Sequence, residues 1–183
     1  LGSASNHSCR IDCISQAWAA ICGGAHGAEA MDALMEMLLD SQSGILRLLT
    51  PAFREPMEQG NPVGYITAYV PGVRENGGQY THGAAWAVWA CCCLGRSEEA
   101  FRLFETLNPL VHTSTRTGAV RYGVEPYALA GDVYAPPNGG RGGWSWYTGA
   151  AAWLYIRRQR QMCIRDRNTT PRPGALLCAL RPL

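Results

Sequence analysis

Two stretches of the chain repeat one pattern: Gln79-Tyr80-Thr81-His82-Gly83-Ala84-Ala85-Trp86 and Trp146-Tyr147-Thr148-Gly149-Ala150-Ala151-Ala152-Trp153. In each stretch a Tyr-Thr pair follows a glycine-rich loop and precedes a run rich in alanine that ends in tryptophan. Threonine is a favourable N-cap and alanine favours helix, so each stretch predicts a helix that begins at its threonine. Because the two helices begin with the same Tyr-Thr pattern, we expect their first residues to form parts of one binding site.

The predicted site is suited to an anion. The first backbone N–H groups of a helix have no partners within the helix and lie at the positive end of its dipole, so they readily bind phosphate. His82 adds an imidazole that can donate to phosphate oxygens, and Thr148 adds a hydroxyl. The alternative is that each threonine only caps its helix, which is the more common role of a single threonine there. The repetition, with a histidine in one copy, favours the anion site.

Further helices are predicted around these stretches. The apolar spacing and the stop signals predict helices over residues 11–21, 28–39, 81–94, 97–108 and 126–133. Residues 51–79 are rich in proline and glycine, and such a long loop usually carries function. Helical hairpins with long loops at one rim predict a ring of helices with a pocket at that rim, and short strands within the loops remain compatible with this arrangement.

The composition limits the function classes. The chain has 183 residues, 47% of them hydrophobic, and a net charge of +2, so it can bury a core but lacks the basic field of a nucleic-acid-binding protein. It contains no lysine, which excludes Schiff-base chemistry within it. The eight cysteines lack zinc-site spacing, and we expect the consecutive Cys91, Cys92 and Cys93 to be small buried residues of a helix in a reducing compartment. No apolar run reaches the roughly 20 residues of a membrane span, so we expect a cytoplasmic segment without membrane contact.

Four motifs resemble one known family, glycoside hydrolase family 94. They are Arg10-Ile11-Asp12-Cys13-Ile14-Ser15-Gln16-Ala17-Trp18-Ala19, Pro71-Gly72-Val73-Arg74-Glu75-Asn76-Gly77-Gly78-Gln79-Tyr80-Thr81-His82, Val124-Glu125-Pro126-Tyr127 and Gly142-Gly143-Trp144-Ser145-Trp146-Tyr147-Thr148-Gly149. The family includes cellobiose, chitobiose and cellodextrin phosphorylases. The residues of these motifs are most similar to those in the C-terminal domain of cyclic β-1,2-glucan synthases and in β-1,2-oligoglucan phosphorylases.

The resemblance implies a fold and a reaction. It implies an all-α (α/α)6 barrel, of which residues 1–158 would be roughly the later half. Family members cleave a β-glucosidic bond with inorganic phosphate, invert the anomeric centre and release α-glucose 1-phosphate, with no cofactor. For this chain the substrate implied is a β-linked glucooligosaccharide or glucan, in particular β-1,2-glucan. We expect the full-length protein to form a homodimer. We also expect a cytoplasmic location, which includes the cytosolic domain of an inner-membrane glucan synthase.

The resemblance also implies roles for individual residues. By position, His82, Thr148 and Gly149 match residues that bind phosphate. Arg74 and Glu75 match residues that bind the acceptor sugar, and the further substrate-binding candidates nearby are Gln79 and Tyr69.

The general acid is the residue that the motifs do not supply. An inverting glycosidase needs an acid and a base, but phosphate is itself the nucleophile of a phosphorylase, so a second carboxylate is unnecessary. The family's acid is an aspartate upstream of these motifs, which places it before Leu1, so we expect this chain alone to be inactive. Asp12, Glu75, Glu125 and Asp132 lie near motifs, and none is assigned as the acid. Trp144 and Trp146 lie in a loop, where their rings could stack on a sugar.

Two other functions are compatible with these motifs. The alternatives are an inverting hydrolase on the same barrel and a non-catalytic domain that binds glucan or controls its chain length. Residues 159–183 do not continue the resemblance. A nucleotide sequence that can encode Gln161-Met162-Cys163-Ile164-Arg165-Asp166-Arg167 contains the end of a sequencing-transposon adapter, so we expect this tail to be an assembly artefact; the alternative is a basic tail that binds an acidic partner.

Overall fold

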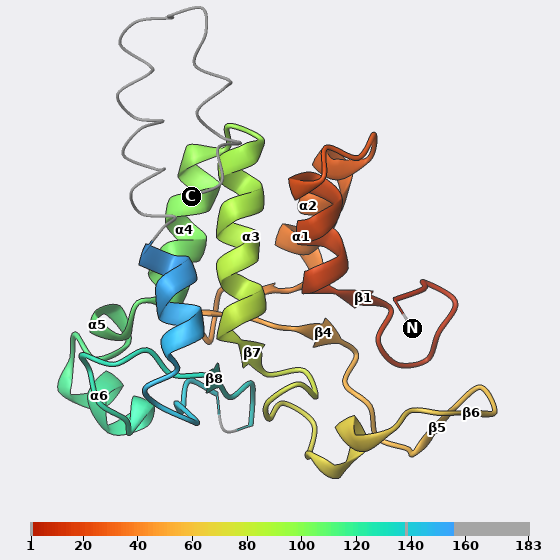
Figure 1. Ribbon diagram of the computed structural model, residues 1–183. Coiled ribbons are helices and arrows are strands. Elements are labelled where there is room, and N and C mark those ends of the chain that lie inside the picture. Colours follow the sequence, from red (N-terminus) through yellow and green to blue (C-terminus); the bar gives the residue numbers. More distant parts are fainter. Residues whose placement is uncertain (1, 138, 156–183) are drawn as a thin grey trace, which may run out of the picture.

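The computed structural model describes residues 2–137 and 139–155 and is mostly helical (Figure 1). Four longer helices form its body: α1 (Cys13–Ile21), α2 (Gly27–Met37), α3 (Thr81–Cys93) and α4 (Ser97–Leu107). Two short helices follow, α5 (Pro109–His112) and α6 (Arg116–Tyr122), and residues 148–155 are helical again. One 3-10 helix, η1, covers Tyr65–Ala68.

Short strands connect the helices. Four antiparallel pairs of two-residue strands lie among the described residues: β1 (Ile11–Asp12) with β4 (Leu49–Thr50), β2 (Leu39–Asp40) with β3 (Ile45–Leu46), β5 (Met57–Glu58) with β6 (Asn61–Pro62), and β7 (Gln79–Tyr80) with β8 (Asp132–Val133). Strands β1 and β7 lead directly into α1 and α3, so the loops gather at the end of the helical body where these two helices begin (Figure 1).

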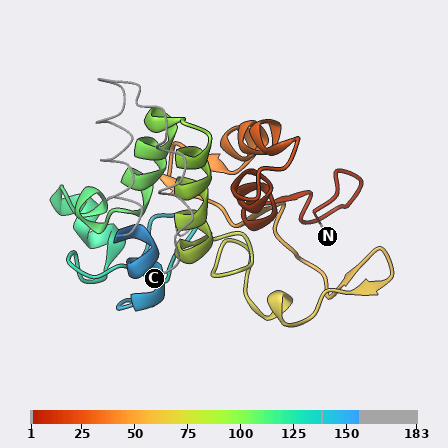
Figure 2. The same ribbon diagram turned by 45° about the horizontal axis from the view of Figure 1, so that its top comes forward.

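Helix α3 is the centre of the helical body. It packs against α1 and α4, and α1 also packs against α2. Its buried residues, Ala84, Ala85, Ala87, Val88 and Ala90 among them, point to several sides of the helix. Small side chains all round a helix allow neighbours to approach from more than one direction, which is the pattern of a buried rather than an amphipathic helix. The 148–155 helix lies beside α3 in both views (Figures 1 and 2), and Trp153 contacts the rings of Trp86 and Trp89.

The helix starts differ in part from the sequence-based expectation. Helix α1 begins at Cys13 rather than residue 11, because Ile11 and Asp12 pair with β4. The Asp12 side chain caps it by accepting the Ser15 N–H at 2.8 Å. The prediction that Thr81 is an N-cap was wrong: Thr81 is the first residue of α3, Tyr80 is the cap position, and the buried Thr81 hydroxyl has no partner.

The helix expected over residues 126–133 was also wrong. Residues Asp132 and Val133 form β8, and the residues before them form turns. The backbone of this segment bonds to distant strands, and Val133 packs in a separate small core with Ile45 and Tyr122. Helix α6 was not predicted; Thr115 caps it by accepting the Gly118 N–H at 3.0 Å. Gly123 ends α6 in the left-handed conformation, with φ at +67°.

The three consecutive cysteines near the end of α3 differ in exposure. Cys91 and Cys92 are buried as predicted, whereas Cys93, the last residue of α3, is exposed. The predicted tail over residues 159–183 lies outside the described residues. No helix within 2–137 or 139–155 combines the length and apolarity needed to cross a membrane.

Candidate functional site

Residues 131–132 connect the two repeated stretches, because hydrogen bonds join them to Tyr80 and Thr81 on one side and to residues 143–144 on the other. Tyr80 pairs with Asp132 in the β7–β8 register, and the Thr81 N–H donates to the Gly131 carbonyl at 3.0 Å. On the other side, the Gly131 N–H donates to the Trp144 carbonyl, and the Gly143 N–H donates to the Asp132 carbonyl at 2.8 Å. Residues 131–132 therefore hold the start of α3 next to the loop that leads into the 148–155 helix.

The side chains of the two stretches are also in contact. The hydroxyl groups of Tyr80 and Tyr147 lie 3.2 Å apart and share a hydrogen bond. A Cβ atom placed on Gly149 would lie 3.7 Å from Cε1 of His82, so only ordinary van der Waals space separates that imidazole from the first turn of the 148–155 helix. Thr148 and Gly149 are exposed at this helix start. The structure thus brings together all three residues expected to bind phosphate.

His82 has the surroundings of a neutral imidazole. Its ring lies against Trp86, with centroids 4.8 Å apart, and near Tyr147 and Trp153, each at 6.3 Å. Burial lowers the pKa of His82 below its usual value, because the apolar rings disfavour the charged form. Its Nε2 atom is buried and has no hydrogen-bond partner. A buried nitrogen without a partner is costly, which is typical of a group that a ligand completes.

A small pocket of about 60 Å³ lies beside this histidine. Its lining consists of Arg74, Glu75, Tyr80, Gly131, Asp132, Trp144 and Tyr147. The two tyrosines that line the pocket are the same two that contact the His82 ring. The pocket and the helix start are therefore neighbouring parts of one site.

Asn76 fixes the loop that carries Arg74 and Glu75. Its buried side chain amide donates to the carbonyls of Phe53 at 2.9 Å and Tyr69 at 2.7 Å, and its oxygen accepts the Phe53 N–H at 2.8 Å. Arg74 adopts a left-handed backbone conformation, with φ at +50°, which costs free energy for a residue with a side chain. Strain of this kind persists where the surrounding contacts determine the backbone, as they do here.

The Arg74 guanidinium stacks on aromatic rings. It lies 3.9 Å from the ring centroid of Trp144 and 5.3 Å from that of Tyr69. Arg74 is free of ion pairs with any of the residues that the structure describes, so the rings hold it without neutralising it. Tyr69 thus reaches the site through Arg74, although it does not line the pocket.

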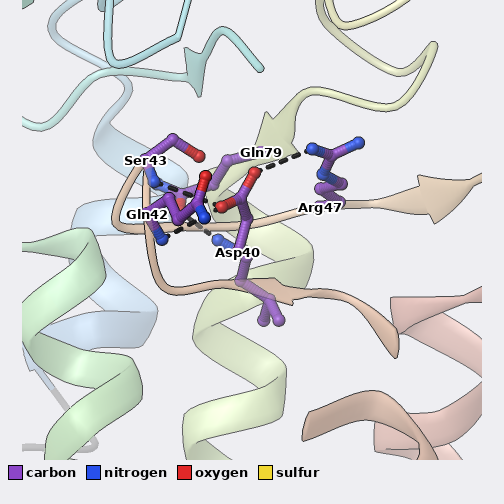
Figure 3. Close-up of polar contacts among 6 residues, drawn as sticks. Asp40, Gln42, Ser43, Arg47 and Gln79 are labelled. Carbon is purple, nitrogen blue, oxygen red and sulfur yellow. Dashed lines mark hydrogen bonds and ion pairs between the residues drawn. The ribbon is translucent and has the colours of Figure 1, made fainter. Parts of the chain in front are cut away.

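Gln79 lies away from the pocket. The residue is 1% exposed, its side-chain oxygen accepts the Leu46 N–H at 2.9 Å, and its side-chain NH₂ donates to the Thr106 carbonyl at 3.4 Å. Figure 3 shows Gln79 next to the β2–β3 hairpin, where Asp40 pairs with Arg47 at 2.7 Å. With both of its polar ends bonded to backbone groups, the Gln79 side chain joins β3 to α4 instead of facing the pocket.

Asp132 lines the pocket, although no role was predicted for it. The residue is 4% exposed, Oδ1 accepts the Trp144 N–H at 3.2 Å, and Oδ2 is buried without a partner. No local pattern marks this position, because the pairing of β8 with β7, 52 residues earlier at Tyr80, places Asp132 at the pocket.

A comparison with protein families decides the identity of the domain. A family model described as "Glycosyl hydrolase 94 superfamily, catalytic domain" matches residues 1–162. The chain belongs to this family. The resemblance read from the motifs is therefore confirmed, and the helical structure is consistent with a glycosyl hydrolase 94 catalytic domain.

Three relatives of the chain carry the names of a glucan synthase and of two phosphorylases. The chain is 49% identical over 159 residues to "Cyclic beta-(1,2)-glucan synthase NdvB" of Rhizobium meliloti (strain 1021), a match that covers 85% of the chain and 6% of that protein. It is 34% identical over 145 residues to "Solabiose phosphorylase" of Paenibacillus borealis, covering 77% of the chain and 18% of the relative. It is 29% identical over 161 residues to "N,N'-diacetylchitobiose phosphorylase" of Vibrio proteolyticus, covering 85% and 19%. The chain spans less than a fifth of the length of each of these relatives.

Proposed function

We propose that this chain forms the phosphate-binding and acceptor-sugar-binding part of an inverting β-glucoside phosphorylase. In this proposal the enzyme cleaves β-linked glucooligosaccharide, in particular β-1,2-glucan, with inorganic phosphate and yields α-glucose 1-phosphate. The observation that carries the proposal is the position of His82 against the first turn of the 148–155 helix, with Gly149 only 3.7 Å from the imidazole when a Cβ atom is added.

The geometry supports a phosphate site for three reasons. The N–H groups at the start of the 148–155 helix lack helical partners and carry the positive end of the dipole. Gly149 has no side chain, so a phosphate oxygen can approach its backbone closely. The His82 atoms nearest Gly149 are Cε1 and Nδ1, so Nδ1 can donate to a phosphate at this helix start, and the exposed Thr148 hydroxyl can do so as well. Phosphate held by these groups would be positioned to attack an anomeric carbon.

The pocket supports a sugar next to the phosphate. Trp144 offers an aromatic ring beside the Arg74 guanidinium, and Glu75 offers carboxylate oxygens that accept from hydroxyl groups. Tyr80 and Tyr147 lie between these residues and His82, so the two ligands would occupy adjacent positions. In our proposal Arg74 and Glu75 bind the acceptor sugar, with Tyr69 stacking on Arg74, and Gln79 has a structural role.

We further propose that the chain corresponds to the later part of an (α/α)6 barrel within a longer protein. The support is that the chain spans between 6% and 19% of its relatives' lengths, and that α1, α3 and the 148–155 helix begin near the same loops. The general acid and the other barrel helices would come from the rest of that protein. In this proposal the reaction uses no cofactor, and inorganic phosphate is a co-substrate. Homodimer formation and a location on the cytosolic side remain predictions.

The test is phosphate release from α-glucose 1-phosphate by the full-length protein, with glucose and β-1,2-linked glucooligosaccharides as acceptors. We expect release that depends on the acceptor, and a loss of at least a hundredfold in kcat/KM for His82→Ala, because a charge-assisted hydrogen bond to the phosphate is removed. Hydrolysis in phosphate-free buffer would instead identify an inverting hydrolase. Sugar binding without either reaction would identify a glucan-binding domain.

A further inference from the structure

One carboxylate oxygen of Asp132 accepts a hydrogen bond and the other has no hydrogen-bond partner. Oδ1 accepts the Trp144 N–H at 3.2 Å, whereas Oδ2 is buried and lacks a partner, and the whole residue is 4% exposed. The carboxylate lies directly on the backbone of Gly143, where an added Cβ atom would overlap with it. Glycine at this position leaves the room that the Asp132 carboxylate occupies at the pocket wall.

The environment of Asp132 is unfavourable for a charge in the absence of a ligand. Burial raises the pKa of Asp132 above its usual value, and the nearby negative charge of Glu75 acts in the same direction. The Trp144 N–H and the charge and backbone N–H of Arg74 act in the opposite direction without reversing the shift. A carboxylate kept in such a place without a full set of partners reduces stability, which is typical of residues retained for binding or catalysis.

Glu75 lines the same pocket and also has a carboxylate oxygen without a hydrogen-bond partner. Its Oε2 atom is buried and has no hydrogen-bond partner. Two acceptor oxygens, Oδ2 of Asp132 and Oε2 of Glu75, are thus unsatisfied in one pocket of about 60 Å³. One water-sized group needs about 10–15 Å³ of such space, so the pocket admits a few hydroxyl groups but not a whole sugar ring.

We propose that Asp132 is a sugar-binding residue which, together with Glu75, accepts hydrogen bonds from two hydroxyl groups on one edge of the acceptor sugar. This inference rests on the proposed function and adds Asp132 to it. Two carboxylates repel phosphate, so the anion stays at the helix start beyond Tyr80 and Tyr147, and the pocket takes the neutral ligand. A sugar that lacks either hydroxyl leaves a buried carboxylate oxygen unsatisfied, so the pair selects for the hydroxyl pattern of the acceptor.

The variant Asp132→Asn isolates the unused oxygen. Asparagine keeps an oxygen for the Trp144 N–H and replaces Oδ2 by an NH₂ group, which donates and cannot accept from a sugar hydroxyl. We expect glucose and a β-1,2-linked glucose disaccharide to bind the full-length variant at least tenfold more weakly than wild type, measured by calorimetry in phosphate-free buffer. The KM for α-glucose 1-phosphate should change less than twofold, and the melting temperature should not fall.

Asp40→Asn is the matched control. Asp40 is, like Asp132, a carboxylate on a two-residue strand, but it pairs with Arg47 at 2.7 Å outside the pocket. The hydrogen bonds from Arg47 and Ser43 lower the pKa of Asp40 to about 2 (Figure 3). Asp40→Asn should lower the melting temperature and leave sugar affinity within twofold of wild type. If Asp132→Asn behaves like this control, Asp132 is a structural residue and the proposal fails.

Wild-type protein supplies an independent measurement in case the variant does not fold. Among glucose derivatives that each lack one hydroxyl, at least two should bind tenfold more weakly than glucose, one for each carboxylate. Equal binding of all derivatives would overturn the proposal. Because sugar binding is measured without phosphate, a protein that binds glucose through Asp132 but releases no phosphate would refute the phosphorylase assignment alone.

Discussion

The hydroxyl groups of Tyr80 and Tyr147 share a hydrogen bond of 3.2 Å, although 67 residues separate them in the sequence. Each tyrosine precedes the threonine at which a helix begins, so the bond joins the starts of α3 and the 148–155 helix. Both rings also contact His82 and line the pocket. The pair therefore lies between the proposed phosphate site and the proposed sugar site.

Tyr147→Phe should loosen this connection. The Tyr147 hydrogen bond and burial raise the pKa of Tyr80 to about 12. Without the Tyr147 hydroxyl the pKa of Tyr80 should fall toward its ordinary value, and the free energy of unfolding should decrease by about 1 kcal/mol, which is typical of one hydrogen bond. Spectrophotometric titration and urea unfolding measure the two effects. Tyr127→Phe is the control, because Tyr127 is 74% exposed and should leave the titration of Tyr80 unchanged.

Gly149→Ala should separate binding from stability. The nearest atoms to the added Cβ are Cε1 and Nδ1 of His82, at 3.7 and 3.9 Å, so the methyl group fits the fold. It occupies space between the imidazole and the helix start, and we expect phosphate affinity to fall at least tenfold in calorimetry while the free energy of unfolding changes by less than about 1 kcal/mol.

Gly78→Ala, in contrast to Gly149→Ala, should lower the stability of the fold. An added Cβ at Gly78 would lie 2.9 Å from the carbonyl oxygen of Arg74 and 3.0 Å from that of Gly72, and neither backbone group can move freely. We expect a loss of about 2 kcal/mol or more in the free energy of unfolding. A strongly destabilised Gly149→Ala variant with normal phosphate affinity would count against the phosphate site.

Gln79→Ala tests the structural role of that residue. The substitution leaves the buried Leu46 N–H without its partner and removes the bond to Thr106, so the free energy of unfolding should fall by about 2–4 kcal/mol. Because Gln79 does not line the pocket, the KM for the acceptor sugar should stay within twofold of wild type in the folded variant. A tenfold rise in that KM without loss of stability would return Gln79 to the sugar site.

The pH dependence of stability should reflect His82. Burial holds the pKa of folded His82 below 6.5, whereas the unfolded chain has the ordinary value, so the unfolded state binds more protons as pH falls below about 6.5. The contribution of His82 is therefore present above pH 6.5 and is lost as pH falls through that value toward the lowered pKa. The same direction holds for His112, whose pKa burial also lowers.

Urea unfolding between pH 5 and 7.5 measures this effect. Subtracting the curve of His82→Gln from that of wild type isolates the His82 contribution, because His112 is common to both. Saturating phosphate should reduce the difference, since a bound anion favours the protonated imidazole. If phosphate leaves the difference unchanged, His82 does not contact the anion.

The helices that sequence reasoning located are those with local signals. Ser97 with Glu98 and Glu99 starts α4, and the alanine run after Thr81 marks α3, because helix hydrogen bonds join residues close in sequence. Segment 126–133 was misassigned because its partners are distant: Asp132 pairs with Tyr80, and apolar content alone does not distinguish a short strand from a helix.

For the site, the sequence identified His82, Thr148 and Gly149 because two similar stretches each carry a helix start. It also marked Arg74 and Glu75 through the family motif. It could not distinguish Gln79 from these residues, since the direction of a side chain depends on what packs around it. Burial places Gln79 against the backbone of Leu46 and Thr106, and it places Arg74 over the ring of Trp144.

The sequence by itself determined the family, the starts of α3 and α4 and the chemical types of the groups near the start of α3, because these depend on local order along the chain. Only the tertiary structure decided that Asp132 joins Glu75 in one pocket, since β8 is held there by hydrogen bonds to residues about 50 positions earlier and 12 positions later. Long-range pairing and burial are properties of the folded chain, and they leave Oδ2 of Asp132 without a partner at the wall of the pocket.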